Sequence, residues 1–250
     1  MSEHLLLPDA RLPLQQTNTL LAPRAVHSGT PAAHAPATAP RFLVVLDVDS
    51  TLIENEVIEM LAECAGSLDL VAHITERAMS GELDFQQSLR SRVSTLAGLS
   101  IDCFTEVARD IRVTQGVPEL IAGLHAADGL VGVVSGGFHE LVDQVAIDLG
   151  LDFWSANRLE VVDGRLTGNV IGPVIDAEAK AAALREWAAG ASIPLAQTVA
   201  VGDGANDLLM MQTAGLSVAF NARPVVRARA HVAIDSRDLA QLLPLLGLRG

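Results

Sequence analysis

Short runs of apolar residues, each ending at a polar or glycine-rich turn, recur along this chain of 250 residues. They predict buried strands at 42–46, 130–134, 198–201, 216–220 and 232–234. A run that is apolar on both faces is typical of a strand in a parallel sheet covered by helices. Segments with helical periodicity lie between these runs, at 118–127, 138–149 and 177–189. This alternation predicts an α/β fold with a Rossmann-like, mostly parallel sheet.

One segment departs from the alternation of strand and helix. Two strand-like stretches within 158–170 flank the dipeptide Asp163-Gly164. A dipeptide of this type favours a tight hairpin turn, because both positions tolerate a left-handed backbone. We therefore expect an antiparallel hairpin in this segment.

Residues 55–113 have a different character from the rest of the chain. Their apolar residues follow helical spacing, they include no proline, and glycines at 66, 81 and 98 interrupt them. This pattern predicts a small helical cap domain inserted after the first strand, with a catalytic core formed by 41–54 and 114–250. Ligands of α/β proteins bind at the carboxyl ends of the strands, so an insertion there is a candidate lid.

Residues 1–40 hold six of the eleven prolines and predict a flexible tail rich in proline and alanine, with Leu20 and Leu21 docked on the body as a weaker alternative. The segment lacks the basic start and continuous apolar stretch of a secretory signal. The two cysteines, Cys64 and Cys103, are far apart and provide neither a disulfide framework nor a zinc site. We therefore expect a cytoplasmic protein that does not enter a membrane.

The charge of the chain restricts its partners. Lys and Arg number 17 against 30 Asp and Glu, and the net charge of −13 argues against a nucleic-acid or anionic-membrane surface. Lys180 is the single lysine. A coding bias toward alanine and arginine explains why lysine is scarce, but not why one lysine remains near the start of a predicted helix. A cation is mildly unfavourable at that end of a helix.

Two acidic clusters directly follow predicted strands. Asp47 and Asp49 end the first strand, and Asp203 and Asp207 follow the strand at 198–201, with Asn206 expected to cap the next helix. Each cluster alone could be a solvated loop or an ordinary turn. Together they supply the oxygen-rich setting that Mg²⁺ prefers, with one carboxylate left free for proton transfer.

Acidic groups repel an anionic substrate, so binding of a phosphate requires donors from elsewhere. Ser135, Gly136 and Gly137 end another predicted strand and offer a hydroxyl group, close backbone approach and the start of a helix. Lys180 offers a cation. The sequence therefore predicts a phosphate site beside the acidic residues.

These four segments reproduce, in order and rough spacing, the motifs of haloacid dehalogenase-like phosphotransferases. Within that superfamily, the segments 54–56, 79–85, 88–93 and 156–159 resemble those of the phosphoserine phosphatases, and the resemblance extends from about Phe42 to Leu239. It implies a Mg²⁺-dependent phosphoric monoester hydrolase that converts O-phospho-L-serine to L-serine and phosphate, the last step of serine biosynthesis. An aspartyl-phosphate would be the intermediate. Val48 stands where the family often has phenylalanine.

The resemblance also implies residue roles. Asp47 would be the nucleophile and Asp49 the proton donor, and one Mg²⁺ would be held by the Asp47 and Asp203 carboxylates and the Asp49 carbonyl. Glu56 would bind the substrate ammonium and Arg92 its carboxylate. The phosphoryl group would be bound by Ser135, Gly136, Lys180 and Asn206. Supporting roles would fall to Thr51, Met79, Phe85, Gly137 and Asp207, with Asp207 orienting Asp203 or a water. Without the resemblance, the residues of 55–113 could equally be ordinary helix and lid residues.

Three alternatives remain open from sequence. The chain could act on another small phosphomonoester, pass the phosphoryl group to an alcohol such as homoserine, or bind a phosphoamino acid without catalysis. The sequence does not decide between a monomer and a homodimer. The segment 1–40 is shorter than the amino-acid-sensing domains of some relatives, so we expect no serine control through such a domain.

Overall fold

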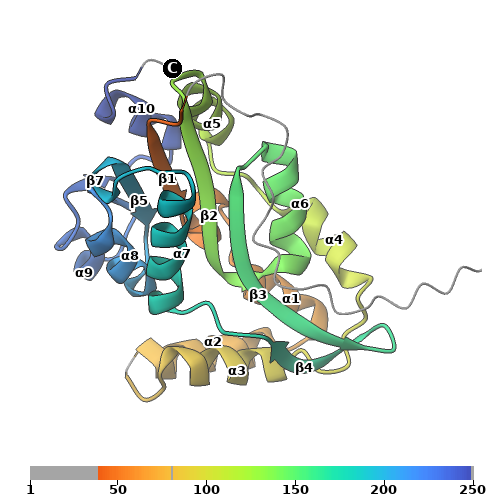
Figure 1. Cartoon of the computed structure of the whole chain (residues 1–250). Helices are drawn as coiled ribbons and strands as arrows, with labels where there is room; N and C mark the ends of the chain where they lie inside the picture. The colour runs from red at the N-terminus through yellow and green to blue at the C-terminus, as the bar shows by residue number, and fades with distance from the viewer. Residues whose placement is uncertain (1–38, 80, 249–250) are drawn as a thin grey trace, which may run out of the picture.

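The computed structural model describes residues 39–79 and 81–248, so the predictions for the tail, including the docked arm at Leu20 and Leu21, lie outside it. A seven-stranded sheet in the order β4-β3-β2-β1-β5-β6-β7 forms the centre (Figure 1). Neighbouring strands are parallel except for β3 and β4, which are antiparallel. The predicted α/β fold with a mostly parallel sheet is confirmed.

All five predicted strands are present, and two of them are longer than predicted. The strands are β1 (Phe42–Leu46), β2 (Gly129–Phe138), β3 (Phe153–Val162), β4 (Arg165–Ile171), β5 (Thr198–Gly202), β6 (Leu216–Phe220) and β7 (Val232–Ile234). In the central strand, Leu46 is in register with Val133 of β2 and Val201 of β5. The carboxyl ends of these three strands therefore lie side by side, which brings the two acidic segments and the segment 135–137 to one edge of the sheet.

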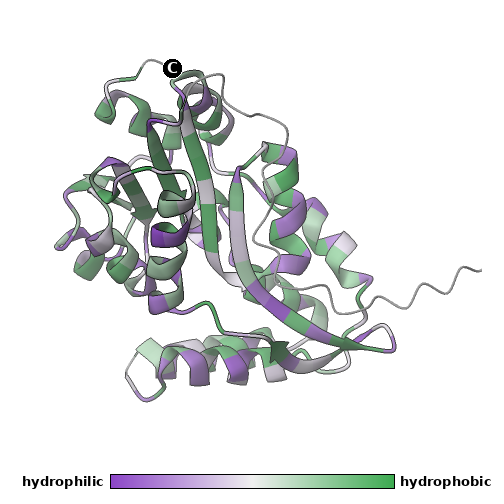
Figure 2. Ribbon diagram, viewed as in Figure 1, coloured by the Kyte–Doolittle hydropathy of each residue, from purple (hydrophilic) through white to green (hydrophobic). Residues whose placement is uncertain are grey.

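Helices cover both faces of the sheet. They are α5 (Val117–Ala126), α6 (His139–Leu149), α7 (Ala177–Gly190), α8 (Leu208–Thr213), α9 (Pro224–Arg227) and α10 (Leu242–Leu245). Side chains of a strand alternate between faces, so Val44 and Leu46 belong to the apolar cluster that includes Leu124 of α5. Leu43 and Val45 belong to the cluster with Leu184 of α7. Figure 2 shows these strands as largely hydrophobic in the middle of the molecule.

Between β1 and α5, after a short helical turn at Val48–Leu52, the described residues form four α-helices, of which α2 and α3 lie across the carboxyl edge of the sheet (Figure 1). They are α1 (Val57–Ala65), α2 (Leu68–Met79), α3 (Phe85–Ser94) and α4 (Cys103–Asp110). The segment that leads into this group of helices and the segment that leaves it are paired, because the Thr114 N–H donates to the Leu52 carbonyl at 2.9 Å. We keep 55–113 as the proposed limits of the cap domain and 41–54 with 114–250 as those of the core.

The predicted hairpin is confirmed. Asp163 and Gly164 have φ of 50° and 72°, the left-handed values that a two-residue turn between β3 and β4 requires. The hairpin also holds the cap, since the Gly98 N–H donates to the Leu166 carbonyl at 2.8 Å and the Leu166 N–H donates to the Leu99 carbonyl at 2.9 Å. None of the helices in the described part of the chain combines the length and the apolar character needed to cross a bilayer.

Candidate active site

A cavity of about 640 Å³ lies between the carboxyl edge of the sheet and the cap. Its lining includes predicted site residues from both sides: Asp47, Asp49, Gly136, Gly137, Asp203 and Asn206 from the core, and Glu56, Met79, Phe85 and Arg92 from the cap segment. Lys180, Ser135 and Asp207 lie behind this lining and are fully buried. The fold thus brings together the residues that the sequence separates by up to 160 positions.

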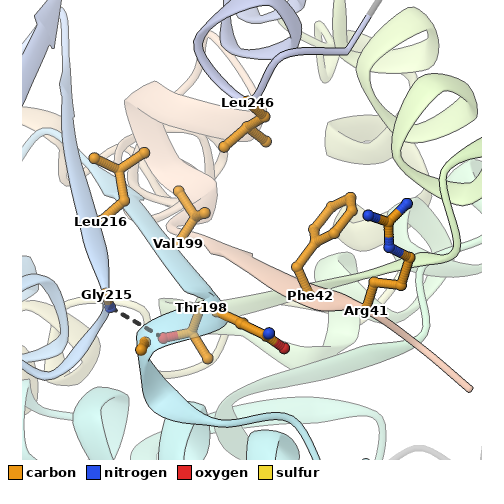
Figure 3. Close-up of a pocket in the computed structure, with 9 residues that line it drawn as sticks. Arg41, Phe42, Thr198, Val199, Gly215, Leu216 and Leu246 are labelled. Atoms are coloured by element: carbon orange, nitrogen blue, oxygen red, sulfur yellow. Dashed lines mark hydrogen bonds between the residues drawn. The ribbon is translucent and has the colours of Figure 1, made fainter.

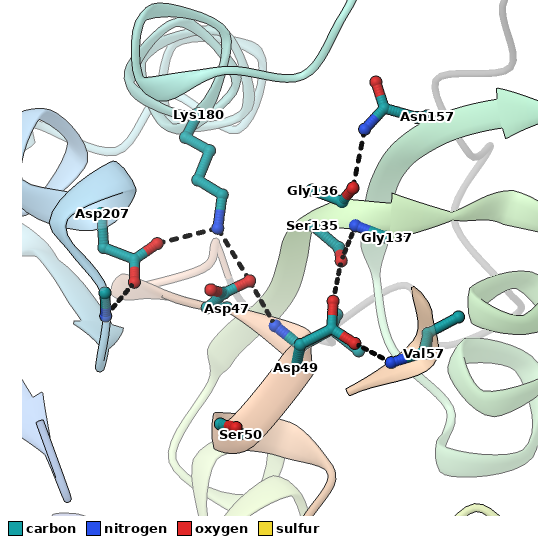
Figure 4. A network of polar contacts seen from close by, with 12 residues as sticks. Asp47, Asp49, Ser50, Val57, Ser135, Gly136, Gly137, Asn157, Lys180 and Asp207 are labelled. Atoms are coloured by element: carbon teal, nitrogen blue, oxygen red, sulfur yellow. Dashed lines mark hydrogen bonds and ion pairs between the residues drawn. The ribbon is translucent and has the colours of Figure 1, made fainter. Parts of the chain in front are cut away.

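The centre of the site is a buried ammonium between two carboxylates (Figure 4). The Lys180 Nζ lies 2.7 Å from the Asp47 Oδ1 and 2.8 Å from the Asp207 Oδ1. The other oxygen of Asp207 accepts the Gly204 N–H at 3.0 Å. Burial and the charge of Asp207 raise the pKa of Asp47 well above its usual range, while the two carboxylates raise the pKa of Lys180. Lys180 is therefore held as a cation by its neighbours.

Helix α7 fixes the position of this lysine. The Asp176 carboxylate caps the helix by accepting the Ala179 N–H at 3.1 Å, and Lys180 follows within the first turn. The unfavourable dipole at this end of the helix is outweighed by the two carboxylates that contact the ammonium group. The prediction that Lys180 lies early in a helix is confirmed, and its reason is the acidic surroundings.

The acidic cluster fits a divalent cation. Ligand oxygens of Asp47, Asp203 and Asp207 lie within 4.8 Å of one another. Three carboxylates face one ammonium group, so two negative charges remain in excess, which a single Mg²⁺ would balance. Both oxygens of Asp207 already accept hydrogen bonds, so Asp47 and Asp203 are the better carboxylate donors. Asp49 has an extended ψ of 133° and the next residue, Ser50, has a left-handed φ, so the backbone is not helical at these two residues.

Asp49 links the core to the cap. Its Oδ1 accepts the Val57 N–H, the first of helix α1, at 2.8 Å, and its Oδ2 accepts the Ser135 hydroxyl at 3.2 Å (Figure 4). Burial raises the pKa of Asp49, although these hydrogen bonds and Lys180 oppose the rise. A carboxyl group that holds its proton more tightly than usual is suited to donate that proton during catalysis.

The segment from Ser135 to Gly137 continues β2 instead of turning directly into a helix, and its pairing with β3 is interrupted between Val134 and Phe138. The Gly137 N–H donates to the Ser135 Oγ at 2.7 Å. A Cβ atom on Gly137 would lie 2.9 Å from the Asp49 Oδ2, so only glycine allows this close approach. The glycine therefore preserves the carboxylate position.

Asn157 is a buried residue of this region that sequence reasoning did not assign to the site. Its Nδ2 donates to the Gly136 carbonyl at 2.8 Å and its Oδ1 accepts the Ile175 N–H at 2.8 Å. The side chain thereby fixes the orientation of the Gly136 peptide from β3 (Figure 4). Asn157 lies in the segment 156–159, which resembles the phosphoserine phosphatases, and this resemblance is the sequence signal that could have indicated it.

Glu56 and Arg92 face the same cavity from the cap side. The Ser50 hydroxyl donates to the Glu56 Oε1 at 2.7 Å, and burial together with the charge of Asp49 raises the pKa of Glu56 to about 7. Burial lowers the pKa of Arg92, while Glu56 and Asp49 oppose the shift. Ser50 was not predicted, and it has a left-handed φ of 56°, which the sequence pattern did not indicate.

The remaining predicted residues have clear positions. Phe85 covers the segment 135–137, because its ring lies 3.2 Å from the place that a Cβ atom on Gly136 would take. Met79 is 65 % exposed and lies at the rim of the cavity. Thr51 is fully buried, and its Oγ1 has no hydrogen-bond partner among the described residues. The prediction that Asn206 caps a helix is wrong: the short 3₁₀ turn Ala205–Asp207 intervenes, and α8 begins at Leu208 without a side-chain cap.

A second cavity, of about 470 Å³, lies at the opposite edge of the sheet (Figure 3). Among the described residues that line it, Arg41 is the charged one. The lining also includes Thr198, whose hydroxyl accepts the Gly215 N–H at 3.4 Å and donates to the Leu195 carbonyl. The described residues that line this cavity include no carboxylate, so they do not offer the groups for the chemistry described above.

Comparisons with known proteins agree with this geometry. The model of the haloacid dehalogenase-like hydrolase family matches residues 44–212. A phosphoserine phosphatase of Streptomyces coelicolor is 55% identical over 206 residues, which are 82% of this chain and 50% of that protein. A phosphoserine phosphatase of Streptococcus thermophilus is 50% identical over 204 residues, or 82% of this chain and 95% of that protein. The chain thus spans half of the first relative and nearly all of the second.

Solved structures give the same result. A phospho-aspartyl intermediate analogue of phosphoserine phosphatase superposes with a TM-score of 0.78 at 44% identity, over 82% of this chain and 99% of that one. A substrate-bound phosphoserine phosphatase complex also has a TM-score of 0.78 at 44% identity, over 82% and 98%. The fold and the site define a capped α/β hydrolase with an aspartate-rich centre. The chain belongs to the phosphoserine phosphatase family of haloacid dehalogenase-like hydrolases.

Proposed function

We propose that this chain hydrolyses O-phospho-L-serine to L-serine and phosphate through an aspartyl-phosphate, with one bound Mg²⁺. The carrying observation is the contact of Lys180 with Asp47 and Asp207 at the floor of a cavity whose other wall holds Glu56 and Arg92. The residues at the floor could carry out phosphoryl transfer. On the opposite wall, the carboxylate of Glu56 could bind the ammonium group of an amino acid, and the guanidinium group of Arg92 could bind its carboxylate. Phosphoserine is a small molecule that presents all three complementary groups.

In this proposal, Asp47 is the nucleophile. Its Oδ1 accepts hydrogen bonds from Lys180 and from the Val48 N–H, both at 2.7 Å. Among the described residues, no donor contacts its Oδ2. One oxygen is thus held in place while the other keeps its lone pairs for the metal and the phosphorus atom. The Asp47 oxygen forms a bond to phosphorus as the bond from phosphorus to the seryl oxygen breaks.

Asp49 would move the protons. Protonated Asp49 gives its proton to the departing seryl oxygen, and the resulting carboxylate then takes a proton from water as that water attacks phosphorus. The bond between Asp47 and phosphorus breaks, and phosphate leaves. The Val57 N–H holds the Oδ1 of Asp49 during these steps, and the Oδ2, which Ser135 contacts in the structure, is the oxygen that carries the proton. Because Val57 begins α1, the acid is in position only when this cap helix is too.

The other residues would bind and orient the substrate. Ser135, the Gly136 N–H, Lys180 and Asn206 would bind phosphoryl oxygens, while Glu56 would bind the ammonium group. Arg92 would bind the carboxylate with its planar fork of donors. A Mg²⁺ held by Asp47, Asp203 and the Asp49 carbonyl would supply positive charge next to the phosphoryl group. Asp207 would position Lys180, since its Oδ1 accepts a hydrogen bond from Lys180 while its Oδ2 accepts the Gly204 N–H.

The test is phosphate release from O-phospho-L-serine by the purified chain, with Mg²⁺ and with excess EDTA, beside a panel of other phosphomonoesters. We expect highest efficiency with phosphoserine, loss of activity in EDTA, and loss of activity in Asp47→Asn. Comparable activity of Asp47→Asn would contradict the covalent route. Transfer to added homoserine in preference to water, or tight binding without turnover, would instead favour one of the alternatives.

The proposal includes a cellular setting. Hydrolysis of phosphoserine is the last step of serine biosynthesis, and Cys64 and Cys103 are both free thiols, as expected in a reducing cytoplasm. Localisation of a tagged chain and serine auxotrophy on deletion would test this setting.

A further inference from the structure

A second arginine lines the active-site cavity and has no role in the scheme above. Arg223 lies at the start of α9, on the core side, and its side chain is exposed at the cavity wall. Its N–H donates to the Asp203 carbonyl at 3.2 Å, which ties its backbone to the acidic edge of the sheet. Among the described residues, no carboxylate lies within ion-pair distance of its guanidinium group.

The other cations of the site already lie next to carboxylates. Lys180 is buried and contacts two carboxylates, and Arg92 lies near Glu56 and Asp49. Among the described residues, four acids line the cavity, namely Asp47, Asp49, Glu56 and Asp203. An approaching substrate with a phosphate dianion therefore meets mostly acids at the surface of the cavity, and the cation that balances the centre lies behind them. A free cation at the wall would reduce this repulsion.

The two arginines of the cavity belong to different parts of the molecule. Arg92 lies on the cap helix α3, where its Nε donates to the Ser88 carbonyl at 3.4 Å, whereas the Arg223 N–H donates to the Asp203 carbonyl of the core at 3.2 Å. The charge of Arg92 acts on the cap side, where Glu56, Asp49 and Glu59 surround it. The charge of Arg223 acts on Asp203, together with that of Lys180. Arg223 therefore belongs to the end of the cavity where the phosphoryl group would be bound, and Arg92 to the end where the amino acid would be bound.

We propose that Arg223 is a substrate-binding residue that captures the phosphoryl group at the cavity mouth and holds inorganic phosphate before its release. The inference rests on the proposed function, since it assigns a further residue to the same reaction. In this proposal, Arg223 recognises the phosphate dianion that all phosphomonoester substrates share, while Arg92 recognises the carboxylate of the amino acid. The guanidinium group acts by charge and hydrogen bonding.

The test compares Arg223→Ala and Arg223→Lys with the wild-type chain on O-phospho-L-serine and on O-phosphoethanolamine, which lacks the carboxylate. We expect Arg223→Ala to raise KM for both substrates by the same factor, about fivefold to tenfold, with kcat changed less than twofold. Arg223→Lys should recover most of the loss because it keeps the charge. The inhibition constant of inorganic phosphate should rise by a similar factor in Arg223→Ala.

A salt series adds a readout that a purely structural role would not change. The kcat/KM of the wild type should fall as salt rises, and that of Arg223→Ala should fall less steeply. Arg227→Ala is the matched control, because Arg227 lies on the same short helix and is paired with Asp235. It should keep the wild-type KM and salt slope.

The outcomes separate this inference from the proposed function. A wild-type chain that releases no phosphate from phosphoserine would overturn the proposed function itself. An active wild type with an unchanged KM in Arg223→Ala would overturn only the role of Arg223. A KM increase confined to phosphoserine would also overturn it, because the residue would then recognise the carboxylate.

Discussion

The two walls of the cavity differ in how tightly the protein holds them. In the core wall, Lys180, Asp207 and Ser135 are fully buried, and their polar groups contact one another or neighbouring backbone at 2.7 to 3.2 Å. In the cap wall, Met79 is 65 % exposed, and the cap helix α3 meets the core through an exposed hydrogen bond from Gln86 to Asp176. The core wall thus keeps its charges in place through buried contacts, whereas this contact of the cap wall is exposed to solvent.

This difference has a physical reason. A buried charge cluster must be preorganised, because reorganising it during catalysis would cost free energy at the transition state. A cap that closes over a substrate must also open to release products, so its contacts with the core have to be individually weak. Substitutions in the core wall should therefore affect chemistry and stability together, and those in the cap wall should affect mainly binding.

The largest effect is expected from Lys180→Met. The change keeps the apolar stem but leaves Asp47 and Asp207 buried beside each other without a cation. We expect kcat to fall by a factor of about 100 to 1,000 or more and the free energy of unfolding to fall by about 3 to 5 kcal/mol. Steady-state kinetics and urea unfolding measure the two effects. Arg185→Ala, an exposed change on the same helix, is the control, and unchanged stability in Lys180→Met would contradict the assignment of a buried charge cluster that depends on Lys180.

Arg92→Lys should have the next largest effect, and it should fall on binding. Lysine keeps the charge but loses the planar fork that suits a carboxylate. We expect KM for phosphoserine to rise about tenfold, which corresponds to about 1.4 kcal/mol, with a small change in kcat. O-phosphoethanolamine lacks the carboxylate, so its KM should hardly change. An equal rise in KM for both substrates would show that Arg92 supports the structure of the cap and does not bind the substrate carboxylate.

The predictability of these residues from sequence follows the same division. Asp47 and Asp203 follow from short motifs at the ends of buried strands, because the register of a parallel sheet brings those ends together. Lys180 lies in helix α7, and the sequence indicated it as the single lysine near the start of a predicted helix. Ser50, Asn157 and Arg223 could not be assigned this way. Their roles depend on a left-handed φ, on a hydrogen bond to a neighbouring strand, and on the placement of α9. None of these properties has a local pattern in the chain.

The pH dependence of binding should report on Glu56. Its pKa in the folded chain is about 7, above its ordinary 4.5, so the folded chain holds a proton that the unfolded chain loses in this interval. The corresponding stabilisation is present at low pH and is lost as the pH rises through 7. Ammonium binding needs the ionised carboxylate, so affinity for the substrate amino group should increase over the same range.

The measurement is the ratio of kcat/KM for phosphoserine to that for 3-phosphooxypropanoate, which lacks the amino group, from pH 6 to pH 8. The ratio cancels the ionisation of the phosphate, which both substrates share. We expect it to rise severalfold in the wild type and to stay flat in Glu56→Gln. A rise that persists in Glu56→Gln would assign the titration to another group.

The smallest effect is expected at the contact between cap and core. The Gln86 Nε2 donates to the Asp176 Oδ2 at 3.0 Å, and the other oxygen of Asp176 caps α7. This bond joins the helix that carries Phe85 and Arg92 to the helix that carries Lys180. Gln86→Glu would set two carboxylates against each other, so KM should rise about twofold to threefold while kcat stays within a factor of two.

A double-mutant cycle tests whether this small effect comes from the contact between residues 86 and 176. Asp176→Asn keeps a side chain that caps helices well and removes the repulsion, so the pair Gln86→Glu with Asp176→Asn should recover the wild-type KM. Hydrogen exchange of α3 should be faster in Gln86→Glu alone and return to normal in the pair. If both variants bind substrate as the wild type does, the exposed bond contributes nothing to closure. The cap would then be held over the core by the β3–β4 hairpin and by the contact of Asp49 with Val57.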